Sequence, residues 1–191
     1  MRKHRADRAI SRAAWTVAMF LTAAVGSAAP AQTPYRLTIF APEGDGFFQA
    51  RDVNNAGQLV GTLSGLGSST TSLMWYDGAL TSLGSGAASA INNNGQVVGA
   101  TSDARGFARA VQWSSSGFAP LTTSALQSSA SDINDRGQIV GFYAETYAEQ
   151  AALWDGGNVT FLGQGIAFGI NNAGQTVGIS SSTGDSHAAL W

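Results

Sequence analysis

One nine-residue phrase occurs four times in this 191-residue chain, and it constrains the fold more than any other feature. The four copies read VNNAGQLVG, INNNGQVVG, INDRGQIVG and INNAGQTVG, and they start at Val53, Ile91, Ile133 and Ile170. Successive starts are 38, 42 and 37 residues apart. A period of this length is typical of repeat architectures, in which each unit packs mainly against its neighbours in the sequence.

Each copy of the phrase predicts a tight turn between two strands. The Asn side chain can hydrogen-bond the backbone two residues on, and the Gly that follows can adopt a positive φ. Alternating runs such as ASAIN precede the turn, and runs rich in β-branched residues such as QVVGAT follow it, as strands require. The turn residues are Asn54 and Gly57, Asn92 and Gly95, Asn134 and Gly137, and Asn171 and Gly174.

A tryptophan follows the last Gly of each phrase after 13 or 14 residues, and the residue three positions before it is always Ser or Ala. A large aromatic residue with a small neighbour predicts interdigitated packing between sheets. A ligand cage built from the tryptophans is the alternative interpretation. The four residues are Trp75, Trp113, Trp154 and Trp191.

These signals predict an all-β fold with four short strands, a to d, in each repeat of ~39 residues, which is the blade of a β-propeller. We expect about four four-stranded blades, with repeat units at about 47–84, 85–126, 127–163 and 164–191. The last unit lacks strand d, and YRLTIF at 35–40 stands where such a strand would precede the first unit. This N-terminal strand is therefore expected to close the ring beside Trp191. A β-solenoid or a fragment of a longer propeller remains the alternative.

Residues 1–31 have the order of a secretory signal peptide. A basic start is followed by an apolar run over 13–25 and by small residues that end in APA, which predicts cleavage after Ala31. The apolar run is shorter than the ~20 residues of a membrane-spanning helix. We therefore expect residues 32–191 to form one repeat domain that is secreted, extracellular or periplasmic, with no membrane span after cleavage.

The composition of residues 32–191 excludes several function classes. Five Arg, eleven acidic residues and no Lys give a formal charge of −6, so no cationic surface is available to neutralise nucleic acid. The chain has no Cys, and His187 is the single His after the leader, which argues against a zinc site of the usual kind. No metal and no cofactor are expected.

The alternation of IN-x-x-GQ-x-VG with a HAALW-like strand resembles the HAF repeat of bacterial extracellular proteins, named for its His-Ala-Phe triplet. The resemblance covers about residues 35–191. The nearest match to the triplet is His187 with the two alanines after it, whereas Thr71, Arg109 and Gln150 stand at the His position of the other repeats. The resemblance implies an exported bacterial protein and carries no established activity.

The loops at the end opposite the Asn-Gly turns differ between repeats and form the predicted binding face. In a four-stranded meander, the a–b and c–d turns lie at one end, and the b–c and d–a connections lie at the other. Variable loops on a rigid scaffold are where binding residues concentrate, although solvated loop residues are the alternative. The candidates are Arg105, Phe107, Arg109, Tyr143, Glu145, Tyr147, Glu149, Asp185 and His187.

We therefore expect a non-catalytic exported domain that binds a protein or glycan partner through its b–c and d–a loops. Tyr143 and Tyr147 would stack on a sugar or peptide. A secreted hydrolase or lyase using the loop carboxylates, with His187 or Tyr143, is one alternative, and a purely structural surface or matrix component is another. A deep pocket with convergent acids would favour catalysis, and a shallow face would favour binding.

Overall fold

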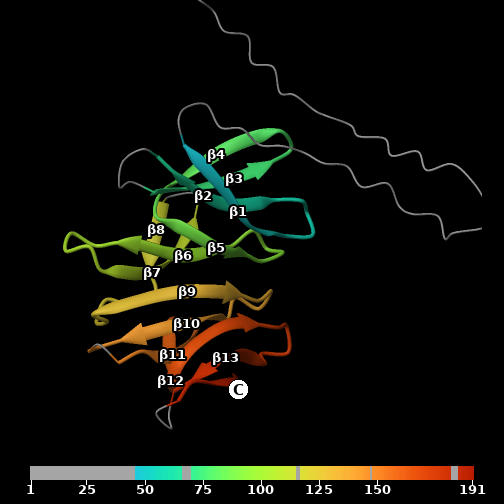
Figure 1. Ribbon diagram of the computed structural model, residues 1–191. Helices are drawn as coiled ribbons and strands as arrows, with labels where there is room; N and C mark the ends of the chain where they lie inside the picture. The colour runs from blue at the N-terminus through green and yellow to red at the C-terminus, as the bar shows by residue number, and fades with distance from the viewer. Residues whose placement is uncertain (1–45, 66–69, 115–116, 147, 182–184) are drawn as a thin grey trace, which may run out of the picture. The chain divides into compact units, whose positions relative to one another are not determined.

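The computed structural model describes residues 46–65, 70–114, 117–146, 148–181 and 185–191. In this part of the chain the regular structure consists of β-strands, with no helix, and paired strands are antiparallel (Figure 1). The fold is therefore all-β, as expected. The predicted signal peptide, the strand at 35–40 and Tyr147 lie outside the described residues.

The strands follow the repeats of the sequence. The first sheet has the order β1-β2-β3-β4, with β1 Phe47–Val53, β2 Leu59–Ser64, β3 Thr70–Tyr76 and β4 Ala79–Ser85. The second sheet has the order β5-β6-β7-β8, with β5 Ala87–Ile91, β6 Val97–Ser102, β7 Ala108–Ser114 and β8 Gly117–Pro120. The third sheet has the order β9-β10-β11-β12-β13-β14, with β9 Gln127–Ile133, β10 Ile139–Ala144, β11 Gln150–Asp155, β12 Asn158–Ile170, β13 Thr176–Ser180 and β14 His187–Leu190.

The third sheet joins two repeats because β12 runs without a break from strand d of the third repeat into strand a of the fourth. Its residues up to Gln164 pair with β11, and those from Gly165 pair with β13. The sequence had predicted two separate strands here. The connection is a Gly-x-Gly stretch, and Gly163 and Gly165 have φ values of 125° and 134°, which only glycine adopts readily.

The Asn-Gly turns have the predicted geometry. In the second repeat, Gly95 has a φ of 75°, and the Asn92 side-chain oxygen accepts hydrogen bonds from the backbone N–H groups of Asn94 at 3.1 Å and Gln96 at 2.9 Å. The Asn92 amide in turn donates to the side-chain oxygen of Gln96 at 2.7 Å. The same bonds recur in the other three copies, so Asn, Gly and Gln are each required by the turn.

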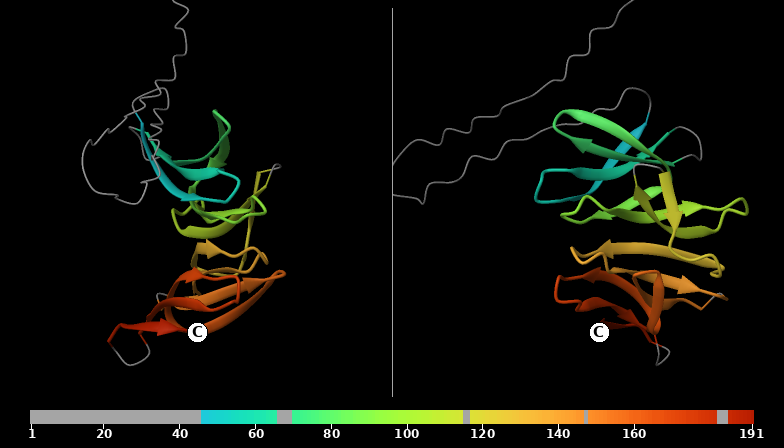
Figure 2. Two further views of the ribbon diagram at one scale, coloured as in Figure 1. Left: turned by 90° about the vertical axis from the view of Figure 1, so that its right-hand side faces the viewer. Right: turned by 180° about the vertical axis from the view of Figure 1, so that it is seen from behind.

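Consecutive repeats pack face to face (Figure 2). Val60 of the first repeat lies in one cluster with Trp113 of the second, and Val98 of the second lies in one cluster with Trp154 of the third. Both tryptophans are buried. They therefore pack between sheets, as the sequence predicted, and do not form an open ligand cage.

A hydrogen-bonded seam also links the repeats along the Asn-Gly turns. The side-chain amide of each Asn donates to the backbone carbonyl of the next: Asn54 to Asn92 at 3.0 Å, Asn92 to Asn134 at 2.9 Å and Asn134 to Asn171 at 3.0 Å. The first strands of neighbouring repeats, β1 with β5, β5 with β9 and β9 with β12, contact one another along this seam. The repeated phrase thus supplies both the turn within a repeat and the joint between repeats.

Candidate binding face

The two ends of the sheets carry different loops, as predicted. In the second sheet, Val97 pairs with Trp113 beside the Asn-Gly turn, whereas Ser102 pairs with Ala108 beside the β6–β7 loop. The b–c loops and the d–a connections therefore share the end away from the Asn-Gly turns. We call this end the variable-loop face.

Asp103 organises the β6–β7 loop of this face. Its carboxylate accepts hydrogen bonds from the backbone N–H groups of Arg105 at 2.9 Å and Phe107 at 3.0 Å. The Asp103 carbonyl accepts a further bond from Gly106, whose φ is 85°. This Asp-x-x-Gly turn repeats the geometry of the Asn-x-x-Gly turns at the other end. The loop is therefore an ordered turn.

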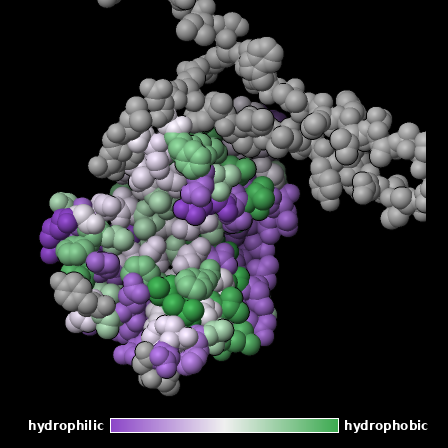
Figure 3. All heavy atoms as spheres, in the orientation of Figure 1, coloured by the Kyte–Doolittle hydropathy of each residue, from purple (hydrophilic) through white to green (hydrophobic). Residues whose placement is uncertain are grey.

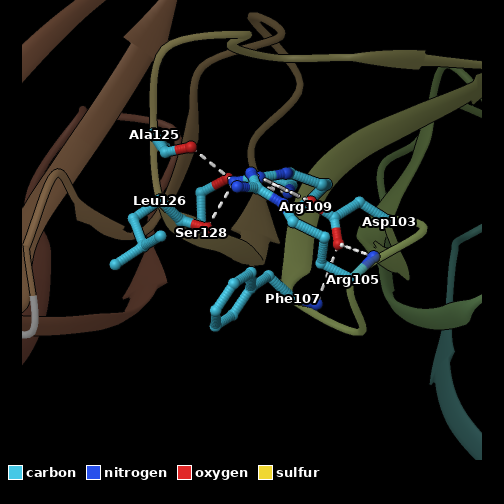
Figure 4. A network of polar contacts seen from close by, with 8 residues as sticks. Asp103, Arg105, Phe107, Arg109, Ala125, Leu126 and Ser128 are labelled. Carbon is cyan, nitrogen blue, oxygen red and sulfur yellow. Dashed lines mark hydrogen bonds and ion pairs between the residues drawn. The ribbon is translucent and has the colours of Figure 1, made fainter.

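Arg109 clamps this loop to the connection between the second and third repeats (Figure 4). Its guanidinium lies 2.7 Å from the Asp103 carboxylate and donates to the backbone carbonyls of Ala125 and Leu126. Desolvation opposes ionisation of Asp103, but hydrogen bonds from Phe107, Arg105 and Arg109 outweigh it and hold the pKa of Asp103 below its usual value. Arg109 is thus engaged within the chain and is not a free binding group.

Arg105 is exposed on the same loop, and Phe107 lies half-buried beside it. The Arg105 side chain is 68% exposed, and its guanidinium carbon lies 5.5 Å from the centre of the Phe107 ring. This distance is within the range of a cation–π contact. The guanidinium is 3.7 Å from Asp103, so most of its hydrogen-bonding capacity faces solvent. A positive charge on an aromatic ring is held at the tip of an ordered loop.

Tyr143 does not lie on the surface as the sequence suggested. Its side chain is only 2% exposed, and its ring packs at 5.0 Å from Phe161. Its hydroxyl donates to Glu145 at 3.1 Å and shares a hydrogen bond of 2.9 Å with Ser124. The ring is therefore part of the core and unavailable for stacking, although Glu145 is exposed beside it.

The remaining candidates lie in the third and fourth repeats. Glu149, Asp185 and His187 are exposed, and His187 begins β14, opposite Ser180. Over the described residues, no group of three or more His, Cys, Asp or Glu side chains is placed to hold a metal ion. The structure thus brings Asp103, Arg105, Phe107 and Arg109 together, and it leaves Glu149, Asp185 and His187 on other repeats.

Grooves between repeats open at both ends of the sheets. At the variable-loop face they are small, about 300 Å³ beside Ser85 and Thr101 and about 210 Å³ beside Glu149 and Gln164. Larger cavities of about 610 and 440 Å³ lie at the Asn-Gly end, lined by Trp113 and Trp154 respectively. These cavities were not predicted from the sequence, in which the Trp that recurs in each repeat was the available signal.

In comparisons with known proteins, no family model and no curated protein matches the sequence of this chain. Within the described residues, the structure contains no helix of the length and apolar character needed to cross a membrane.

Proposed function

We propose that this chain is an exported, non-catalytic repeat domain of the HAF-like type, which binds a protein or glycan partner through its variable-loop face. We further propose that its repeats are the blades of a propeller-type array. Face-to-face packing of successive meanders and the mutual contact of their first strands support this arrangement. Ring closure of four blades by the strand at 35–40 stays a prediction of the sequence.

The β6–β7 loop carries the proposal. Asp103 and Arg109 fix its backbone, so Arg105 and Phe107 present a charge and a ring without a large ordering cost on binding. A guanidinium over an aromatic ring suits ligands that bear carboxylates next to apolar surface. Uronate-containing glycans and acidic peptides have this chemistry.

The shape of the variable-loop face also favours binding over catalysis. Its grooves are shallow, and Glu149 is the single acidic residue that lines them among the described residues. Glu145 accepts a hydrogen bond from the buried Tyr143, which gives both groups a structural partner. These features support a binding role more than the hydrolase or lyase alternative.

Binding to a glycan array with neutral and uronate-containing oligosaccharides, together with an acidic peptide library, tests the proposal. The Arg105→Ala and Phe107→Ala variants should lose at least about tenfold in affinity for any ligand found. Arg136→Ala is the matched control, because Arg136 is an exposed arginine on an Asn-Gly turn at the opposite end. No ligand on either panel, or an equal loss in the control, would contradict the proposal.

A further inference from the structure

The joint between the third and fourth repeats shows what one repeat presents to the next. On one side, Val140, Ala151 and Leu153 of the third repeat form its outer face. On the other side, Ala167, Ile170 and Trp191 of the fourth repeat pack against them. The two faces are different in shape and composition, and each repeat carries both.

Over the described part of the chain, the outer face of the fourth repeat is exposed. Its residues equivalent to Val140, Ala151 and Leu153 are Val177, Ala188 and Leu190. Val140 is fully buried, whereas Val177 is 50% exposed and Leu190 is 68% exposed. We call these three residues the tail face.

Over the described residues, the first repeat has an exposed face of the opposite kind. Its residues equivalent to Ala167 and Ile170 are Ala50 and Val53, which we call the head face. Ala167 is fully buried, whereas Ala50 is exposed and Val53 is 59% exposed. The two uncovered faces are therefore counterparts of two faces that pack together within the chain.

We propose that the tail face of one molecule docks on the head face of a second copy of this chain, continuing the stack of repeats from one molecule into the next. The contact would be Val177, Ala188 and Leu190 against Ala50 and Val53, as at the joint between the third and fourth repeats. Exposed apolar surface of this kind marks an interaction site, and the internal joint supplies its complementary partner. A head-to-tail contact produces a closed ring or an open fibre, depending on the rotation between copies.

The polar seam supports the same partner. All four Asn amides donate to the Gln of their own turn. Those of Asn54, Asn92 and Asn134 donate a second hydrogen bond, to the next repeat, and Asn171 is the equivalent residue of the fourth repeat. Docking would bring the Asn54 carbonyl of the second copy to Asn171. The Asn54 carbonyl already accepts a hydrogen bond from Gly57. It can accept a second one, as the Asn92 carbonyl does from Gly95 and from Asn54.

An Asp side chain bonds across every second joint between repeats, and docking of two copies would continue this alternation. Asp52 bonds the backbone N–H of Ile91 in the next repeat, and Asp132 bonds that of Ile170, each at 2.8 Å. Ala90 and Gly169 occupy the equivalent position in the second and fourth repeats. The joint between the second and third repeats therefore forms without the carboxylate, and the joint between two copies would be of that type.

Sedimentation velocity of the purified protein over a range of concentrations tests the proposal. The wild-type protein should associate, and Leu190→Lys on the tail face or Val53→Lys on the head face should weaken association at least about 30-fold. Phe118→Lys is the matched control, because Phe118 is an exposed apolar residue on β8 of the second repeat. Circular dichroism checks that each variant is folded, which is expected because the substituted side chains are exposed.

Mixing the two variants distinguishes a head-to-tail contact from a symmetric one. Leu190→Lys keeps an intact head face and Val53→Lys keeps an intact tail face, so the mixture should form a complex of one molecule of each and grow no further. A wild-type protein that stays monomeric would overturn the proposal. If Leu190→Lys and Val53→Lys both destabilise that monomer, the two end faces are covered within the same chain. If the Val53→Lys variant associates as strongly as the wild type, the head-to-tail proposal is wrong and the contact is tail-to-tail. Arg105→Ala should associate normally, because the variable-loop face is separate from both end faces.

Discussion

The side-chain amide of Asn92 donates a hydrogen bond of 2.9 Å to the backbone carbonyl of Asn134, which lies 42 residues further along the chain. The same side chain holds its own turn together through Asn94 and Gln96. One buried amide therefore determines both a local turn and the spacing of two repeats. This double use explains why Asn stands at this position in the first three copies of the phrase, and the turn bonds alone explain it in the fourth.

Asn92→Ala should destabilise the protein by about 2–3 kcal/mol, because buried backbone groups lose their partners. Asn171→Ala is the matched control, since Asn171 is exposed and its side chain makes only the bonds of its own turn among the described residues. Its cost should be about 1 kcal/mol or less. Urea denaturation measures both values at a concentration where the protein is monomeric. Equal costs would contradict a role for Asn92 in the joint between repeats.

Gly95→Val should destabilise the second repeat by about 1–3 kcal/mol, because a β-branched residue resists the φ of 75° at this position. Gly95→Asn should cost much less, since Asn tolerates this region of the backbone. Thermal unfolding followed by circular dichroism compares the two variants. A melting temperature of Gly95→Val equal to that of the wild type would count against the importance of the turn.

The residues that recur in the sequence were sufficient to predict the turns and the tryptophans buried between the sheets. Asn92, Gly95 and Trp113 each stand at a position where one residue type recurs, and the physical reason for that type is local: a turn bond, a positive φ or a buried ring. The sequence did not predict the fusion of two repeats through β12, because the expected boundary between the units 127–163 and 164–191 falls inside the Gly-x-Gly stretch around Gln164. Two glycines there allow the bend without interrupting the pairing.

The candidate site was less accessible from the sequence. Arg109 is a charged residue next to a variable loop, but its partners include two backbone carbonyls on the following connection, and a carbonyl has no signature in a sequence. Tyr143 was interpreted as a loop residue, yet β10 extends to Ala144 and directs the ring inward. The uncovered faces at Val177 and Val53 could not be predicted either, because the terminal repeats have the same apolar pattern as the buried ones.

Arg109→Met should destabilise the protein by about 1–3 kcal/mol, because it removes charge-assisted hydrogen bonds to Asp103 and to the carbonyls of Ala125 and Leu126. Arg105→Met is the matched control, since its exposed guanidinium should contribute about 0.5 kcal/mol or less. Urea denaturation measures both costs. A similar loss for the two variants would show that Arg109 does not act as a clamp.

Asp135 should give the protein a stability that acid removes. Hydrogen bonds from the side chain and backbone N–H of Asn93 and from the side chain of Asn172 hold the pKa of Asp135 below its usual value. A lowered pKa in the folded state means that the stabilisation is complete above the unfolded pKa of about 3.9 and is lost as the pH falls through the folded value. The difference in melting temperature between wild type and Asp135→Asn should therefore shrink as the pH is lowered from about 6 to about 2.

Asp132 should show the opposite sign and so provides the control for that experiment. Burial raises its pKa, and the nearby Asp52 charge adds to the effect, although the backbone N–H groups of Ile170 and Ile133 oppose it. A raised pKa in the folded state makes the contribution of the group largest below the unfolded pKa, and that contribution is lost as the pH rises through the folded value. The stability of wild type relative to Asp132→Asn should therefore increase as the pH falls over the same range. Two differences that change with pH in the same direction would contradict the opposite environments of Asp132, near the end of β9, and Asp135, in the turn that follows.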